Sequence, residues 1–324
     1  MWYTRVTVLE VHQYVQKQIN RYEGDSMSEA AEKKVRKAVI TDAGFASRYL
    51  PITKTVPKGM LPLGNRPIMQ FMVEECAQAG IEEIIIVATP EGKPVYEDYF
   101  NNSVNRIRKQ LASQGKADRY EPVQHILDFP KIVVITQDES LPYGNGSPVV
   151  SAARFLEGEE AFVVIYSDDV VFGEQGDVKT MVDLYEKNPD VSGIIMSQEV
   201  SGDVVDKYGI IKFKENSDTD LDYIVEKPDK GTEPSRLGSY GRYLLTPEVL
   251  EHLTGSNTGK DNELWTVDAI TKVAKKKRVL VGKTKGEWLT TGDPENYFKA
   301  HLKFVIDTEK YGKKVAGWVA EMQE

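Results

Sequence analysis

A short stretch of small residues follows the first apolar run of the chain and is itself followed by two basic residues. It reads Ala43-Gly44-Phe45-Ala46-Ser47-Arg48. A turn of small residues can point successive backbone N–H groups at a phosphate. Arg48 closes the turn and Lys58 comes ten residues later, and two cations beside such a turn would neutralise a polyphosphate. The segment therefore favours triphosphate binding, although an ordinary turn with an exposed arginine looks the same.

The chain after Arg36 alternates between two patterns that would position this turn. Short apolar runs predict buried strands at Ala38–Ile40, Ile84–Ala88, Ile132–Thr136 and Phe162–Tyr166. Helix-like segments lie between them at residues 67–79, 95–114, 147–157 and 176–187. Strands that alternate with helices predict βαβ units, and hence an α/β fold whose mainly parallel sheet has helices on both faces.

The second half of the chain changes character. Strand-like segments stand at residues 191–200, 209–214 and 221–225, and only turns separate the last two. This pattern predicts a mixed sheet added to the first. Helical patterns return at residues 262–277 and 294–311.

Composition excludes several classes of protein. The chain of 324 residues carries 50 acidic and 41 basic side chains, for a net charge of −9. This balance argues against general binding to nucleic acid or to a membrane surface, because both are polyanionic. Cys76 is the one cysteine, so an intrachain disulfide and a CxxC zinc site are excluded. The apolar runs are too short for a membrane span and no secretory signal is evident, so we expect a cytoplasmic protein.

The order of residues after Lys37 resembles the sugar nucleotidyltransferase family, whose signature is AGxGTRxLP followed by PKxxLP. Here the two elements read Ala43-Gly44-Phe45-Ala46-Ser47-Arg48-Tyr49-Leu50-Pro51 and Pro57-Lys58-Gly59-Met60-Leu61-Pro62. Within this family the spacing is most similar to that of the bacterial UTP–glucose-1-phosphate uridylyltransferases, which have PKEMLP. The resemblance implies a Rossmann-like mixed sheet of the nucleotide-diphospho-sugar transferase type, with a small β extension on the sugar side.

Further landmarks of the family follow in the same order, and the resemblance runs from Lys37 to Ile306. They are Gln137 with Tyr143-Gly144-Asn145-Gly146, the insertion Asn101–Pro130, Ser167-Asp168-Asp169, Tyr208-Gly209-Ile210, Glu226-Lys227-Pro228, Gly241-Arg242-Tyr243, Asn262–Ile270 and Trp288–Tyr297. Each is weak by itself, but their collinear order is specific.

The resemblance implies that an oxygen of a sugar 1-phosphate attacks the α-phosphorus of the nucleotide in line and displaces pyrophosphate. In this reading Arg48, Lys58 and Asp168 are catalytic. Arg48 grips the leaving phosphates, Lys58 neutralises charge on the α-phosphoryl group and Asp168 holds Mg²⁺. The nucleotide would contact Ala43, Gly44, Ala46, Ser47, Gln137 and Gly144. The sugar phosphate would contact Gly209, Glu226 and Lys227.

The chain departs from the family pattern at several positions. Ala46 replaces the second glycine of the turn and Ser47 replaces threonine; if the backbone there needs a positive φ, Ala46 costs about 1 kcal/mol. Gly59 replaces the glutamate of PKEMLP, which would loosen the segment that carries Lys58. Thr290 stands where the family has its second metal-binding aspartate. Asp169 and Asp293 are the candidates to replace that carboxylate.

The resemblance implies that UTP and glucose 1-phosphate give UDP-glucose and pyrophosphate in a Mg²⁺-dependent reaction. A thymidylyltransferase or another sugar-1-phosphate nucleotidyltransferase remains an alternative within the class. A non-catalytic subunit that binds nucleotide sugar and regulates a partner remains an alternative outside it. A nicotinamide-dependent dehydrogenase is disfavoured because the first turn lacks GxGxxG.

The domain boundaries expected are an N-terminal extension at residues 1–34, a nucleotidyltransferase domain at 35–311 and a C-terminal tail at 312–324. Glu23-Gly24 precedes Met27, and purine-rich codons for this pair can spell a ribosome-binding sequence. We therefore hypothesise that translation starts at Met27. The habit of the family makes a homo-oligomer the expected assembly.

Overall fold

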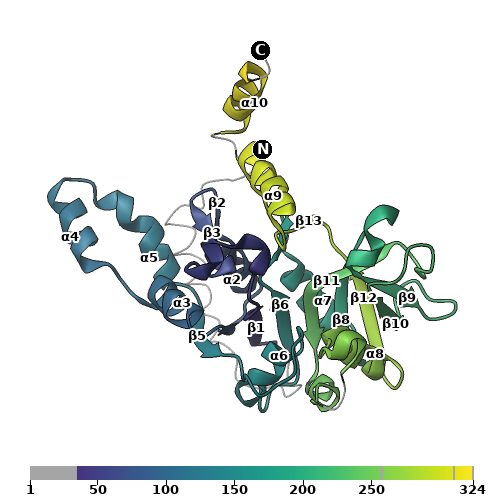
Figure 1. Ribbon diagram of the computed structural model, residues 1–324. Helices are drawn as coiled ribbons and strands as arrows, with labels where there is room; N and C mark the ends of the chain where they lie inside the picture. The colour runs from purple at the N-terminus through teal and green to yellow at the C-terminus, as the bar shows by residue number, and fades with distance from the viewer. Residues whose placement is uncertain (1–34, 256–257, 309–310, 323–324) are drawn as a thin grey trace. The chain divides into compact units, whose positions relative to one another are not determined.

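The computed structural model describes residues 35–255, 258–308 and 311–322 (Figure 1). The expected N-terminal extension and the hypothesis of a start at Met27 lie outside these residues. The chain divides into two compact units, Lys34–Ala300 and a second one that contains His301–Glu324. The first unit holds the sheet. In the second, α10 (Gly312–Glu321) is a helix of ten residues.

The first unit is built on a mixed sheet of nine strands. Four neighbouring strands are parallel and stand in the order β6 (Phe162–Tyr166), β1 (Lys37–Asp42), β4 (Glu83–Ala88) and β5 (Lys131–Thr136). The antiparallel β11 (Leu237–Leu245) continues the sheet beyond β6. It pairs with β8 (Val191–Glu199) and β9 (Gly209–Phe213), which in turn pair with β12 (Arg278–Lys283) and β10 (Leu221–Glu226). This is the mixed α/β sheet that the sequence predicts.

Two short ribbons complete the strands. One pairs β2 (Pro62–Leu63) with β3 (Arg66–Pro67). The other pairs β7 (Asp169–Phe172) with β13 (Glu287–Thr290), and in its register Thr290 lies opposite Asp169. Only two residues separate the end of β6 from the start of β7. The second ribbon therefore fixes the chain around Asp168.

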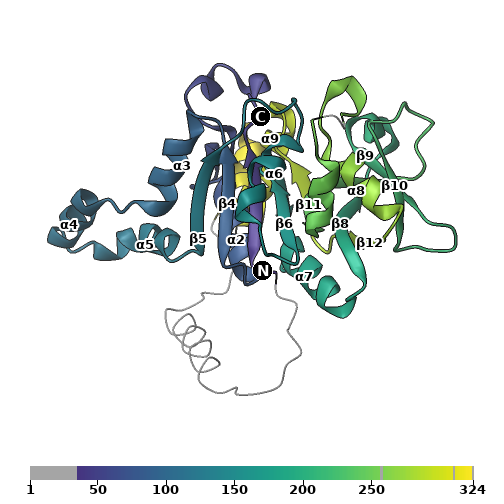
Figure 2. The ribbon, with the colours of Figure 1, turned by 90° about the horizontal axis from the view of Figure 1, so that it is seen from below.

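Helices cover both faces of the sheet, as the views in Figures 1 and 2 show. On one face, the alternate residues Val39, Ile85 and Val164 form a buried core with α6 (Ser147–Ser151) and α8 (Thr266–Ala274). On the other face lie α2 (Ile68–Gln78) and α7 (Asp177–Lys187), which pack against each other. Strict alternation of buried side chains along a strand places successive residues in opposite cores.

Several predicted helices are shorter than the sequence suggests. The segment 95–114 is two helices, α3 (Gly92–Asn101) and α4 (Asn105–Ser113), because the chain is extended at Asn102. The N–H of Val104 donates to the Tyr120 hydroxyl at 2.8 Å instead of to a helical carbonyl. The segment 147–157 divides into α6 and a 3-10 turn at Ala153–Phe155.

The two C-terminal segments are shortened as well. The segment 262–277 starts only at Thr266, because Asp261 and Asn262 have positive φ and Trp265 is extended. The segment 294–311 ends at Asp307 in α9 (Pro294–Asp307).

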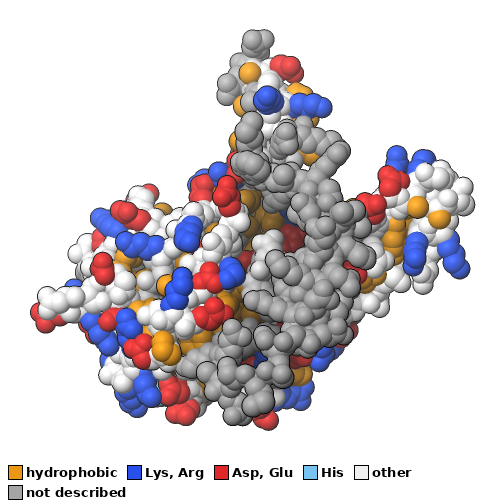
Figure 3. Space-filling model, turned by 180° about the vertical axis from the view of Figure 1, so that it is seen from behind, with side chains coloured by type: hydrophobic (Ala, Val, Ile, Leu, Met, Phe, Trp, Pro, Cys, Tyr) orange, Lys and Arg blue, Asp and Glu red, His pale blue; other side chains and the backbone are white. Residues whose placement is uncertain are grey.

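The insertion 101–130 carries α4 and α5 (Glu121–Leu127), which extend beyond β5 in Figure 2. None of the α4 side chains is buried. On the face drawn in Figure 3, acidic and basic side chains are intermingled among the described residues. Among the helices of the described residues, none has the length and apolarity needed to cross a membrane.

Candidate active site

Parallel strands end at one edge of the sheet, and the chemically interesting residues follow those ends. The turn after β1, Gln137 after β5 and Asp168 after β6 therefore lie at the same edge. Two adjoining cavities open there, a first cavity of about 770 Å³ and a second cavity of about 670 Å³. Both are lined by Arg48, Asn145, Tyr166, Asp168, Lys227 and Gly292.

The two cavities together are lined by every residue to which the sequence assigned a catalytic, nucleotide-binding or sugar-phosphate-binding role. The first is lined by Ala43, Gly44, Ala46, Ser47, Arg48, Lys58, Gln137, Gly144 and Asp168. The second is lined by Gly209, Glu226, Lys227 and Thr290, again with Arg48 and Asp168. Arg48 and Asp168 stand at the junction, and Lys58 reaches Asp168 from the first cavity.

The turn after β1 contains one residue, Ala46, in the left-handed backbone conformation. Ala46 has φ 45° and ψ 40°. This left-handed conformation is the positive φ at which alanine is less stable than the glycine that the family has here. The exposed side chain of Arg48 donates from Nη1 to the Gly292 carbonyl at 3.3 Å. The turn thus holds its conformation although one residue in it is strained.

We expect Ala46→Gly to raise the free energy of unfolding by about 0.5–1 kcal/mol, because relief of the left-handed strain exceeds the added chain entropy. Urea denaturation measures the change. Ala43 lies in the same turn and has no positive φ, so Ala43→Gly should instead lower stability. If Ala46→Gly lowered the free energy of unfolding as Ala43→Gly does, strain at Ala46 would be refuted.

Lys58 and Asp168 form an ion pair at the base of the first cavity. Nζ of Lys58 lies 2.8 Å from Oδ2 of Asp168, and the two side chains are 17% and 30% exposed. Burial opposes ionisation of Asp168, but the attraction of Lys58 and its hydrogen bond prevail and lower the pKa of the carboxyl group. In the same way, burial opposes the charge on Lys58 while Asp168 holds its pKa above the usual value. Both groups are therefore charged.

A buried hydrogen-bond network fixes the segment that carries Lys58. The Gly59 N–H donates to Oδ2 of Asp42 at 3.3 Å, and the Tyr96 hydroxyl donates to the same oxygen. Ser167 donates to Oδ1 of Asp42 at 2.6 Å. A Cβ on Gly59 would lie 2.5 Å from the Tyr96 hydroxyl oxygen. The expectation that Gly59 loosens this segment is wrong, because glycine leaves the space in which Tyr96 and Asp42 anchor it.

Gly59→Ala should lower the free energy of unfolding by about 1–3 kcal/mol, since its Cβ must displace the buried Tyr96 hydroxyl. Thermal unfolding followed by circular dichroism measures this. Gly44→Ala is the matched control, because a Cβ there meets nothing within 4 Å. The same shift in both variants would argue against a specific role for the space at Gly59.

The loop after β5 is held by a distant part of the chain. The Leu264 N–H donates to the Tyr143 carbonyl at 2.7 Å, and the Gly146 N–H donates to the Leu264 carbonyl at 2.8 Å. Gly144 has φ 135°, and a Cβ on it would lie 2.4 Å from the Leu264 carbonyl oxygen. The Thr266 N–H donates to the Asn145 side chain at 2.8 Å. The sequence marks both segments but gives no sign that one supports the other.

The second cavity places one cation against an acidic and an aromatic side chain. Nζ of Lys227 lies 3.6 Å from Oε1 of Glu226 and 4.3 Å from the centre of the Trp265 ring. Lys227 itself is left-handed, with φ 48°, and its N–H donates to the Tyr208 carbonyl at 3.1 Å. Gly209 is packed so closely that a Cβ would lie 3.0 Å from Oε2 of Glu226. Strain of this kind is found where a side chain must point at a ligand.

Both carboxylate oxygens of Asp169 accept hydrogen bonds from other residues of the protein. Trp288 donates from Nε1 to its Oδ1 at 2.7 Å, and the Gly241 N–H donates to its Oδ2 at 2.9 Å. Burial and the neighbouring Asp168 raise the pKa of Asp169 to about 6. Asp169 therefore holds Trp288 and Gly241 in place.

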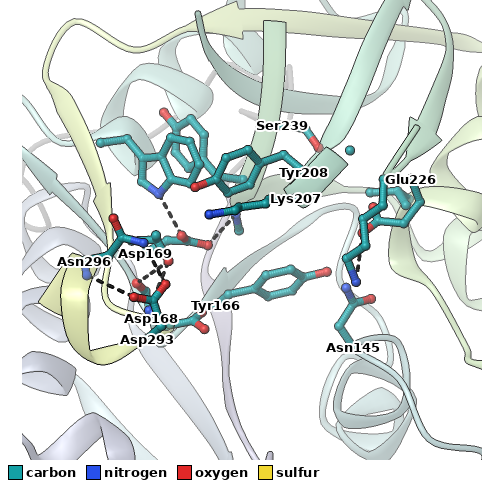
Figure 4. A pocket seen from close by; sticks show the side chains of 18 of the residues that line it. Asn145, Tyr166, Asp168, Asp169, Lys207, Tyr208, Glu226, Ser239, Asp293 and Asn296 are labelled. Carbon is teal, nitrogen blue, oxygen red and sulfur yellow. Dashed lines mark hydrogen bonds and ion pairs between the residues drawn. The ribbon is translucent and has the colours of Figure 1, made fainter. Parts of the chain in front are cut away.

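Asp293 points into the second cavity, as does Asp168 (Figure 4). Asn296 donates to both of its oxygens, at 3.0 Å from the backbone and 2.6 Å from the side chain. Burial opposes the charge, but these bonds and the nearby Lys207 and Arg48 lower the pKa of the carboxyl group. In residues 35–255, 258–308 and 311–322, His, Cys, Asp and Glu form no group of three or more that could hold a metal.

Beneath the second cavity lies an ion pair whose role the sequence does not reveal. The side chain of Arg242 is fully buried and contacts Glu75 through Nη2 at 2.9 Å and through Nε at 3.1 Å. Arg242 also donates to the carbonyl oxygens of Gly241 and Asp169 at 2.9 and 2.6 Å. Glu75 in turn accepts from the Val178 N–H at the start of α7. The pair thus ties α2, α7 and β11 to the chain around Asp169.

This fold and this pair of cavities are those of a nucleotide-sugar-forming transferase, and the chain belongs to the nucleotidyl transferase family, whose model matches residues 37–305. A UTP–glucose-1-phosphate uridylyltransferase of Staphylococcus epidermidis is 35% identical over 292 residues, which are 90% of this chain and 99% of that protein.

Two solved structures of UDP-glucose pyrophosphorylases are similar to this chain. A UDP-glucose pyrophosphorylase in complex with UDP-glucose is 32% identical with a TM-score of 0.72, over 84% of this chain and 98% of that one. The UTP-bound enzyme of Acinetobacter baumannii is 28% identical with a TM-score of 0.79, over 89% and 99%. The resemblance read from the sequence is confirmed.

Proposed function

We propose that this chain is an enzyme that transfers the uridylyl group of UTP to glucose 1-phosphate, giving UDP-glucose and pyrophosphate. The observation that carries the proposal is the junction of the two cavities, where Arg48, Lys58 and Asp168 stand between a phosphate-binding turn and a polar pocket. Relatives named as UTP–glucose-1-phosphate uridylyltransferases support the choice of substrates.

UTP occupies the first cavity in this proposal. Its phosphates lie against the turn of Ala43, Gly44, Ala46 and Ser47, with Arg48 on the phosphates that leave. Lys58 sits at the α-phosphoryl group, where its charge stabilises the transition state. Gln137 offers both a donor and an acceptor to the edge of the base, and Gly144 leaves room for the backbone to approach it.

Glucose 1-phosphate occupies the second cavity. Lys227 pairs with its phosphate, Glu226 accepts hydrogen bonds from sugar hydroxyls, and Gly209 allows close approach of the sugar. A phosphate oxygen of the sugar then faces the α-phosphorus across the junction, in line with the leaving pyrophosphate. Holding the two substrates in this order removes most of the entropic barrier to the bimolecular step.

The residues at the junction fit Mg²⁺. Asp168 and Asp293 are both ionised carboxylates that line the second cavity, and each oxygen of Asp293 keeps a lone pair beyond its bond to Asn296. Mg²⁺ binds through one or two carboxylates together with phosphates and water. When bound it neutralises phosphate charge; Asp168 would hold it and Asp293 would supply the charge that Thr290 does not.

The test is pyrophosphate release by the purified chain with UTP, glucose 1-phosphate and Mg²⁺, beside dTTP and the variant Thr290→Asp. We expect release with UTP by the natural chain, and faster release than with dTTP. Release with dTTP alone would make the chain a thymidylyltransferase. If the natural chain releases no pyrophosphate and Thr290→Asp does, the result would contradict the proposal. It would favour a subunit that binds nucleotide sugar without turnover.

Residues 35–311 form the catalytic domain in this proposal, between the extension 1–34 and the tail 312–324. We further propose that the chain acts as a homo-oligomer. Light scattering of the purified protein at assay concentration tests this assembly, and a monomeric mass with full activity would refute it.

A further inference from the structure

Two aromatic rings stand exposed at the first cavity, and the proposed mechanism uses neither. Phe45 is 78% exposed and Tyr143 is 62% exposed, and both line the cavity. Their ring centres are 6.4 Å apart and their planes differ by 5°. Phe45 comes from the turn after β1 and Tyr143 from the loop after β5, so the two rings face the cavity from different strand ends.

The backbone, and not side-chain packing, holds these rings. Phe45 lies directly before the left-handed Ala46. The Tyr143 carbonyl accepts from the Leu264 N–H at 2.7 Å, and the following Gly144 is pressed against the Leu264 backbone. Leaving two large rings in water forfeits the free energy of burying them. Two anchored rings that stay exposed beside a cavity therefore point to a flat apolar ligand.

The spacing of the rings suits such a ligand. Directly packed aromatic pairs have their centres about 4.5–7 Å apart, and this pair is near the wide end of that range. A planar ring inserted between two others needs about 7 Å, which is twice the contact distance of about 3.5 Å between carbon atoms. The two rings are nearly parallel with centres 6.4 Å apart, so rings brought face to face would need about 0.6 Å more between their centres to admit such a ligand.

We propose that Phe45 and Tyr143 clamp the pyrimidine base of the nucleotide between their faces. This inference rests on the proposed function, because it takes the phosphates to lie at Arg48 and Lys58. The base then lies beside Gln137 and Tyr143, which line the same cavity. Stacking accepts any base with a flat face, so the clamp supplies affinity while Gln137 reads the edge.

The experiment compares UTP with inorganic tripolyphosphate, which has the phosphates but no base. Calorimetry gives the dissociation constants for the natural chain, Phe45→Leu, Tyr143→Ala and Tyr143→Phe. We expect Phe45→Leu and Tyr143→Ala each to weaken UTP about tenfold and to leave tripolyphosphate within twofold. Tyr143→Phe, which keeps the ring, should bind both ligands as the natural chain does. Phe298→Ala is the matched control, because Phe298 is 64% exposed but lines neither cavity.

A second readout reports the stacking itself. The uracil H5 and H6 protons of UTP should shift upfield on binding to the natural chain, through the ring currents of the clamp, and shift less with Phe45→Leu. Unchanged UTP affinity in both ring-removing variants would overturn the clamp. Equal weakening of UTP and tripolyphosphate would also overturn it, because the turn and not the base would then be affected. A natural chain that binds tripolyphosphate but not UTP would refute the proposed function itself.

Discussion

We expect Lys58→Met to lower the turnover number for pyrophosphate release by about 10²–10³-fold, which is the usual effect of removing one group that stabilises charge in a transition state. The change keeps the aliphatic stem of the side chain and removes only the charge. Lys58 lies 2.8 Å from Asp168, which lines both cavities. The Michaelis constant for glucose 1-phosphate should change little, since the proposal assigns the sugar to the second cavity.

Steady-state kinetics with a coupled pyrophosphate assay measures this effect. Lys54→Met is the matched control, because Lys54 is exposed on the same loop and lines neither cavity. Asp168→Asn should lose comparable activity, and the double variant should lose far less than the product of the two losses, because paired residues act as a unit. A Lys58→Met enzyme within threefold of the natural rate would remove Lys58 from the mechanism.

We expect Arg242→Met to lower the free energy of unfolding by about 3–5 kcal/mol, because it leaves Glu75 as an uncompensated charge in the interior. Arg242 is 0% exposed and Glu75 is 9% exposed. The loss also removes the bonds of Arg242 to the carbonyl oxygens of Gly241 and Asp169. Because these carbonyls belong to the chain around the second cavity, activity should fall at temperatures where the variant is still folded.

Urea unfolding measures the stability of this variant. The double variant Arg242→Met with Glu75→Leu should recover part of the loss, since apolar side chains that fill the space of a buried pair can replace it. Arg278→Met is the control, because Arg278 pairs with Asp190 and Asp220 near the surface and such pairs contribute about 0–1 kcal/mol. Similar losses for Arg242→Met and Arg278→Met would show that burial of the Arg242 pair has no special importance.

Local patterns along the chain were enough to predict several parts of this protein. Apolar runs located the parallel strands, because a strand buried on both faces is apolar throughout. Because the carboxyl ends of parallel strands lie at one edge of a sheet, the turn at Arg48, Gln137 and Asp168 are found together there in the structure. The replacement of glycine by Ala46 even predicted where the backbone would be strained. The collinear motifs identified the family.

The residues that support this edge from distant parts of the chain could not be predicted in this way. Arg242 pairs with Glu75 across 167 residues, and Leu264 holds the loop of Tyr143 although no periodicity links them. Gly59 suggests a weak point in the sequence, whereas in the structure the Tyr96 hydroxyl occupies the space beside it. The single helix predicted at 95–114 is two helices in the structure, because the chain is extended at Asn102 and the N–H of Val104 donates to the Tyr120 hydroxyl. Periodicity records what each residue does along its own element, whereas these contacts arise between elements, and their distances follow only from how the whole chain packs.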